Sequence, residues 1–382
     1  MKKLIFGLSA IFLAACGGND GKESGNIYQD LTISMDTVMV DAGEDFLYLR
    51  ENLWLSDISA DGRYLFNFNR NDAVLEKIDL DRLVLDKKIK FEKEGPNGIG
   101  TFISNFSITS EEQIMIWSYG LSAVFDQGGQ LVKNLNLDKI TADEIKESDA
   151  FLMALYENPN DKNRYVGFYI KWEDRSYFLL DLDIDKETYK KIELPELKNL
   201  DDYAVELMYE GQFVGAFGTG THSLDAGNII VVSNLVFNEA YIHDFSSGGL
   251  MFKSWDGPLI GSKKTYIPPK QVDFQSSQHW EVSKKIDEDI NYGKMLWDPK
   301  NERYLRFSTM EKFGDDKEEN GAFKPIGANV FLSVFDKDFN LVAESLVPNL
   351  NKKPLKHFVK DGQIWIFENM DDELAFLKLS VE

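Results

Sequence analysis

Residues 124–133 read Val-Phe-Asp-Gln-Gly-Gly-Gln-Leu-Val-Lys, and residues 334–343 read Val-Phe-Asp-Lys-Asp-Phe-Asn-Leu-Val-Ala. The two stretches align position for position at their apolar residues and at Asp126 and Asp336. Polar turns of Gly, Asp and Asn between runs rich in β-branched and aromatic residues predict β-hairpins. Looser copies of the same unit occupy residues 78–89, 180–192 and 242–252.

A second kind of hairpin precedes each of these units along the chain. Its copies span residues 54–68, 105–117, 151–170, 222–233, 295–307 and 357–367. The last copy is followed by only one more strand, at residues 374–381. Six first hairpins and five second hairpins therefore leave one strand missing.

The missing strand has a candidate at the other end of the chain, because residues 31–40 alternate like a strand. Four-stranded units arranged in a ring form a β-propeller. The pattern predicts an all-β, six-bladed propeller whose last blade is closed by the N-terminal strand, which leaves no open edge. The alternative is a pair of β-sandwiches, which would not require matched hairpins or an orphan strand at each end.

Uneven spacing of the blades predicts three insertions, at residues 195–212, 256–290 and 311–328. The first two join one blade to the next, and the third joins two strands of the fifth blade. In a propeller these loops emerge on one face, and long loops in compact domains are often functional. We therefore expect the insertions to cluster over the channel mouth, near His222.

Five residues in and beside these insertions are candidate contacts for a ligand or partner: Tyr266, His279, Trp280, Arg306 and Lys312. Aromatic and Arg side chains often dominate binding energy. His222 is a sixth candidate, because Gly218 and Gly220 precede it where an innermost strand begins. These glycines either let a ligand approach the backbone or relieve crowding around the axis.

Composition excludes several classes of function. With 42 Lys and Arg against 64 Asp and Glu, the net charge is −22, so no basic footprint for nucleic acid is present. The four histidines show no zinc-ligand spacing. An EF-hand loop starting at Asp181 would need Gly and Glu where Lys186 and Ile192 stand. We expect no metal site and no cofactor.

The N-terminus reads as a bacterial secretion signal. Lys2 and Lys3 precede an apolar run over residues 4–15, which is too short to span a bilayer. The run ends in Leu13-Ala14-Ala15-Cys16, which resembles the lipobox of lipoproteins. That resemblance implies cleavage before Cys16 and acylation of its thiol by palmitate-type chains, which anchor the protein in a membrane. Alternatively, Cys16 is an incidental residue of a cleaved signal.

These features predict three segments: a signal peptide at residues 1–15, a flexible tether at 16–29 and the propeller at 30–382. Cys16 is the only cysteine, so no disulfide can form within the chain. Gly17 follows it, so no acidic residue there indicates retention in the inner membrane. We expect attachment to the outer membrane, on either its periplasmic or its surface face.

Other motifs are similar to known sequences. Residues 91–98 (Phe-Glu-Lys-Glu-Gly-Pro-Asn-Gly), together with the hairpins and the lipobox, resemble the six-bladed propeller lipoproteins abundant in Bacteroidetes. Residues 239–244, 292–299 and 303–307 resemble one family among them that is known only as a domain of unknown function. The resemblance implies a propeller fold and carries over no catalytic residue.

Two functions agree with these observations. One is a lipid-anchored, monomeric module of the envelope that binds a protein partner or a glycan. The other is a metal-assisted hydrolase or lyase, which would need carboxylate, Asn or His side chains from several blades to meet at the mouth of the channel. The fold does not decide between them, so the sequence leaves open whether the protein is an enzyme.

Overall fold

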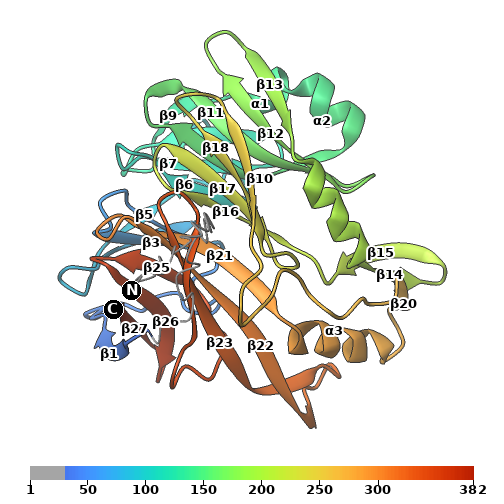
Figure 1. Ribbon diagram of the computed structural model, residues 1–382. Coiled ribbons are helices and arrows are strands. Elements are labelled where there is room, and N and C mark those ends of the chain that lie inside the picture. The colour runs from blue at the N-terminus through green and yellow to red at the C-terminus, as the bar shows by residue number, and fades with distance from the viewer. Residues whose placement is uncertain (1–30) are drawn as a thin grey trace, which may run out of the picture.

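The computed structural model describes residues 31–382 (Figure 1). The fold is all-β, and six antiparallel four-stranded sheets contain most of its strands. Sheet 1 comprises β2 (Ser56–Ile58), β3 (Tyr64–Asn69), β4 (Val74–Asp79) and β5 (Val84–Lys90). Sheet 2 comprises β6 (Asn105–Ile108), β7 (Ile114–Ser118), β8 (Leu121–Phe125) and β9 (Leu131–Asn134). Sheet 3 comprises β10 (Ala150–Asn158), β11 (Asp161–Lys171), β12 (Ser176–Asp183) and β13 (Thr188–Glu193).

The other three four-stranded sheets follow in chain order. Sheet 4 comprises β16 (Thr221–Asp225), β17 (Ile229–Asn234), β18 (Glu239–Asp244) and β19 (Leu250–Ser254). Sheet 5 comprises β21 (Asn291–Asp298), β22 (Arg303–Lys317), β23 (Phe323–Asp336) and β24 (Leu341–Leu346). Sheet 6 comprises β25 (His357–Lys360), β26 (Gln363–Met370), β27 (Glu373–Val381) and, from the other end of the chain, β1 (Ile33–Met39).

The predicted hairpins and the predicted pairing of the two ends are confirmed. Each of the eleven hairpins expected from the repeats is an antiparallel strand pair. β1 runs antiparallel to β27, with Ile33 opposite Val381 and Met39 opposite Ala375. The predictions for residues 1–30, including the signal peptide and Cys16, lie outside the described residues.

Apolar side chains fill the space between successive sheets. Phe68 of sheet 1 and Phe106 of sheet 2 place their ring centroids 5.8 Å apart. Phe376 of sheet 6 belongs to the same cluster as Ile78 of sheet 1. Further clusters join sheets 2, 3 and 4, sheets 4 and 5, and sheets 5 and 6. Burial between sheets removes large apolar areas from water, and this is the main favourable term in folding.

Elements outside the six sheets lie in the connections. β14 (Val205–Tyr209), β15 (Gln212–Phe217) and β20 (Gln271–Asp273) form a three-stranded sheet. The helices are α1 (Leu137–Ile140), α2 (Ala142–Ser148), the 3-10 helix η1 (Pro195–Asp202) and α3 (Gln278–Glu288). Among residues 31–382, none of the helices is long and apolar enough to cross a membrane.

Candidate functional site

The three insertions lie together at one side of the molecule, as expected (Figure 1). β20 of the second insertion pairs in parallel with β14 of the first, with Glu206 opposite Gln271. α3 of the second insertion packs against the extended β22–β23 hairpin, where Lys317 Nζ lies 3.8 Å from Glu281 Oε1. The first insertion runs beyond its predicted end at residue 212 and includes all of β15. We call residues 195–217, 256–290 and 311–328 the insertion surface.

A small apolar core holds the insertion surface together. Val282 and Ile286 of α3 are buried against Val205 of β14 and Val272 of β20. Gly218 is required beside this core, because its φ is +93° and an added Cβ would lie 2.9 Å from the Tyr203 carbonyl oxygen. The same Cβ would lie 3.0 Å from Ile286 Cδ1. α3 therefore packs beside Gly218, which lies just before β16 and four residues before His222.

Four of the six candidate contact residues belong to the insertion surface. The His279 ring lies between Phe274 and Trp280, with ring centroids 5.9 Å and 4.4 Å away. The tip of the β22–β23 hairpin approaches Trp280, since a Cβ on Gly321 would lie 3.2 Å from Trp280 Nε1. Tyr266 packs partly buried against the apolar core, and Lys312 is exposed on β22.

Arg306 does not meet the expectation that it contacts a ligand on this surface. Its side chain is fully buried, with 0% exposure. One terminal nitrogen donates to Asn238 Oδ1, and the rings of Tyr292 and Phe335 lie 5.1 and 5.2 Å from its guanidinium carbon. Burial lowers the pKa of Arg306 to about 10. β22 is buried on both faces here, so strand alternation could not reveal which way Arg306 points.

His222 belongs to a different group of side chains, drawn from the first strands of four sheets. We call this group the first-strand cluster: Asp57 on β2, His222 and Asp225 on β16, Lys294 on β21, His357 on β25, and Lys356 directly before β25. β21 contacts both β16 and β25. Lys294 and Asp225 are exposed and the other four residues partly exposed, so water reaches the cluster.

Protein surrounds the cluster closely enough to shift the pKa of every member. Burial lowers the pKa of His222 and of His357 to about 4, so both imidazoles are neutral at pH 7. Burial also lowers the pKa of Lys294 and brings that of Lys356 to about 8. It raises the pKa of Asp57 and brings that of Asp225 to about 7. Perturbed titratable groups gathered in one place are a mark of functional sites.

The hydrogen bonds of the cluster leave polar atoms available. The Ile108 backbone N–H donates to Asp57 Oδ2 at 2.8 Å, and Lys356 Nζ donates to the Ser56 carbonyl at 2.6 Å. Lys294 Nζ has no hydrogen bond or ion pair with any group that the structure describes. Of this group, only His222 was predicted from the sequence. The other members could have been identified from the polar residues that occur in or next to the predicted first strand of each sheet.

The donor set required for metal chemistry does not assemble. Among residues 31–382, no three His, Cys, Asp or Glu side chains lie close enough together to hold a metal ion. The aspartates after residue 180 have protein partners instead: Asp181 pairs with Arg164, and Asp183 Oδ2 lies 2.7 Å from Lys186 Nζ. The first-strand cluster adds two lysines to its two carboxylates and two imidazoles, and the positive charges of these lysines would repel a metal cation.

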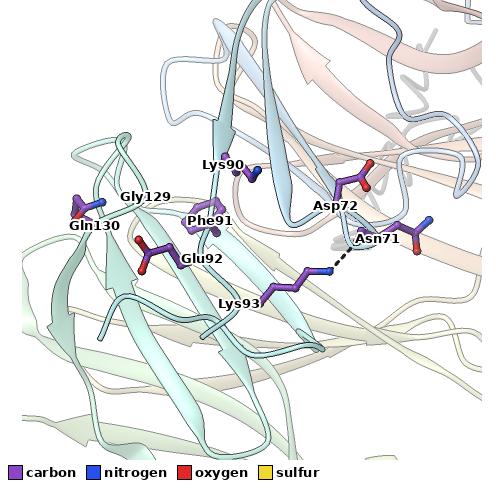
Figure 2. Close-up of a pocket in the computed structure, with 8 residues that line it drawn as sticks. All are labelled: Asn71, Asp72, Lys90, Phe91, Glu92, Lys93, Gly129 and Gln130. Atoms are coloured by element: carbon purple, nitrogen blue, oxygen red, sulfur yellow. Dashed lines mark hydrogen bonds between the residues drawn. The ribbon is translucent and has the colours of Figure 1, made fainter. Parts of the chain in front are cut away.

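Two pockets lie away from the first-strand cluster. Figure 2 shows the first, of about 590 Å³, between the turns of sheets 1 and 2, where Lys93 Nζ donates to the Asn71 carbonyl at 2.9 Å. The second, of about 410 Å³, adjoins the insertion surface. Exposed Trp172 and Phe213 line this second pocket, together with the Arg175–Glu206 ion pair.

Two solved structures of proteins from Bacteroides share this fold. A member of the DUF4221 family from Bacteroides vulgatus matches with a TM-score of 0.61 at 14% identity, over 92% of this chain and 98% of that chain. A putative exported protein from Bacteroides fragilis matches with a TM-score of 0.51 at 6% identity, over 93% and 98% of the two chains. The β-propeller domain of Cps50 (Swd1) from Myceliophteria thermophila gives 0.39 at 8% identity, over 90% and 99%.

None of the curated proteins matches this sequence. The family model described as a domain of unknown function (DUF4221) matches residues 29–346. That match covers most of the chain and includes five of the six four-stranded sheets. The expectation drawn from residues 239–244, 292–299 and 303–307 is thereby confirmed, and the chain belongs to the DUF4221 family.

Proposed function

We propose that the six four-stranded sheets are the blades of a closed propeller, with β1 completing the last blade. Contacts between each sheet and the next support this ring. Trp255 Nε1 of the chain after β19 donates to the Phe339 carbonyl in sheet 5, and Arg303 of sheet 5 donates to the Val381 carbonyl in sheet 6. The return from sheet 6 to sheet 1 has its own bonds, with Lys360 Nζ 2.5 Å from Asp81 Oδ1.

We infer that this propeller is an envelope module that binds a protein partner through the insertion surface. The observation that carries the proposal is the character of β15, an edge strand of the three-stranded sheet. On its outer side β15 pairs with no other strand of residues 31–382, and it exposes Phe213 and Val214. An exposed apolar edge strand is a template for pairing with another chain, and proteins without such a use usually protect it.

A glycan is the second candidate ligand, and the Trp172–Phe213 pocket favours it. Both aromatic side chains are more than half exposed, at 53% and 57%. Flat aromatic surface next to charged groups suits sugar rings, which present apolar faces and hydroxyl edges. The pocket shares Phe213 with β15, so both ligands would engage the same part of the insertion surface.

Attachment to the outer membrane through Cys16 completes the proposal. It rests on the signal sequence and its lipobox. The exported protein of Bacteroides fragilis, which shares the fold, supports an envelope location. A tethered propeller would present the insertion surface to partners in the envelope.

Photo-cross-linking in living cells tests the binding surface. A photo-reactive amino acid replaces Val214 on β15 in one strain and Val132 on β9 in another. The two valines are equally exposed, at 52%, and lie on well-separated parts of the molecule (Figure 1). We expect a discrete covalent adduct from position 214 and none from position 132.

Digestion of the adduct separates the two candidate ligands. A cross-linked peptide from a second protein, found by mass spectrometry after trypsin digestion, indicates a protein partner, and a loss of added mass on glycosidase treatment indicates a glycan. Equal adducts from both positions, or none from position 214, would contradict a binding role for the insertion surface.

A further inference from the structure

The first-strand cluster lies apart from β15, and its composition indicates a ligand of its own. Lys294 is its most informative member. Its ammonium group has three N–H donors and no protein acceptor within hydrogen-bonding or ion-pairing distance among the described residues. Asp57 and Asp225 act on Lys294 only through longer-range attraction. A lysine that protein surrounds but does not pair can bind an anion without breaking an existing ion pair.

Lys356 supplies a second positive charge beside Lys294. Charge repulsion from Lys294 lowers the pKa of Lys356. Repulsion from both lysines lowers the pKa of His357. The Lys356 ammonium uses one donor on the Ser56 carbonyl and keeps two more. An anionic group next to both lysines would relieve this repulsion.

The other members of the cluster, two imidazoles and two carboxyl groups, offer hydrogen-bond acceptors. His357 Nδ1 lies 2.6 Å from the Leu355 carbonyl, so this nitrogen carries the proton and Nε2 has a free lone pair. His357 Nε2 and His222 Nε2 have no partner within the described part of the chain. Asp225 accepts from the Gly227 N–H at 2.8 Å through Oδ1. Acceptors of this kind require a ligand that carries several donors.

We propose that the first-strand cluster binds a small hydroxylated acid, such as a sugar acid. Its carboxylate contacts the two lysines, and its hydroxyl groups donate to the carboxylates and imidazoles around them. A neutral sugar lacks the anion that Lys294 requires, and a simple acid lacks the donors that the acceptors require. The site comes from β2, β16, β21 and β25, so one ligand would contact four sheets at once.

Isothermal titration calorimetry of the purified full-length protein tests this proposal with glucuronate, glucose and acetate as probes. We expect saturable binding of glucuronate with a Kd between about 1 µM and 1 mM. We expect acetate to bind at least about tenfold more weakly and glucose to give no saturable heat. Lys294→Gln should weaken glucuronate binding by at least about tenfold, because it removes the unpaired charge.

Lys337→Gln is the matched control, because Lys337 is also an exposed lysine whose side chain has no hydrogen bond or ion pair among the described residues, and it lies in the turn between β23 and β24. It should bind glucuronate like the wild type. Should Lys294→Gln fail to fold, NMR shifts of the His222 and His357 rings on adding glucuronate to the wild-type protein provide a second test.

Several results would overturn the proposal: no saturable heat or ring shift with glucuronate, equal binding of glucose or acetate, or unchanged affinity in Lys294→Gln. The cross-link from position 214 is measured separately, so either proposal can fail without the other.

Discussion

Glu239 shows how one buried acid makes stability depend on pH. It lies in β18 at 8% exposure, and its Oε1 accepts from Asn234 Nδ2 at 3.2 Å. Burial raises its pKa from 4.5 to about 7. The folded state therefore holds a proton that the unfolded chain releases between these values, so the contribution to stability is complete below pH 4.5 and is lost as the pH rises to 7.

Glu239→Gln should remove this dependence, because glutamine copies the neutral acid. We expect the variant to be more stable than the wild type above pH 7, by up to about 3 kcal/mol, and equally stable near pH 4. Urea denaturation at pH 4 and pH 8 measures the difference. Glu319→Gln, at an exposed position in the hairpin tip, is the control. A constant difference at both pH values would show that Glu239 acts through packing and not through its charge.

The candidate site was only partly predictable at the level of single residues. His222 was identifiable because two glycines precede it in a first strand. Arg306 was misplaced because both faces of β22 are buried, which removes the alternation that separates inward from outward positions. Asp57 and Lys294 sit in no local motif, and their proximity depends on packing between sheets.

At the level of elements, the pairing of β1 with β27 leads to a prediction about how the N-terminal strand stabilises sheet 6. It pairs along its whole length with β27, while Ile33 and Met35 pack against the core between sheets 5 and 6. Deleting residues 30–41 should remove this apolar contact and expose the edge of β27. The deletion also removes Val40, which is 2% exposed. We expect aggregation, or a loss of at least about 3 kcal/mol in the free energy of unfolding, since a fully buried apolar side chain contributes about 1.5–3 kcal/mol and the partly buried Ile33 and Met35 add to it.

Differential scanning calorimetry and size-exclusion chromatography measure the two outcomes of this deletion. A chain with Ser34→Ala and Asp36→Ala is the control, because both side chains are exposed on β1. It should remain monomeric and keep its melting temperature. A deletion variant that is also monomeric with an unchanged melting temperature would show that β1 serves only as a tether.

The hairpins and the places of the insertions were predictable, whereas the structure inside the insertions was not, for a physical reason. Asp126 and Asp336 fix their own turns: each side chain accepts backbone N–H bonds two and four residues later. Such local chemistry is visible in sequence. β14 instead pairs with β20, more than 60 residues away and in parallel, and α3 depends on Val205 and Val272 for its buried face. Pairings of that kind leave no local pattern.

At the scale of the whole molecule, the sequence predicts the all-β architecture better than the activity. The repeat count and the orphan strands follow from chain order alone. The first-strand cluster joins Asp57 to His357 across most of the chain, and a propeller scaffold supports many unrelated functions. The two proposed sites therefore depend on side chains that meet between sheets and on insertions at one side, which chain order does not reveal.

We expect the attachment of the protein to a membrane through Cys16 to be independent of the folding of the described residues. Cys16 precedes the described residues, which pack their apolar cores without it. Cys16→Ser should abolish acylation, so we expect the protein in the soluble envelope fraction or as an uncleaved precursor. Membrane fractionation and mass spectrometry of the N-terminus measure this outcome, with Gly17→Ser as a control that keeps the thiol.

The melting temperature of a chain beginning at residue 30 should equal that of the Cys16→Ser protein after its signal is removed. Normal membrane retention with an unchanged N-terminus would show that Cys16 is an incidental part of a secretion signal.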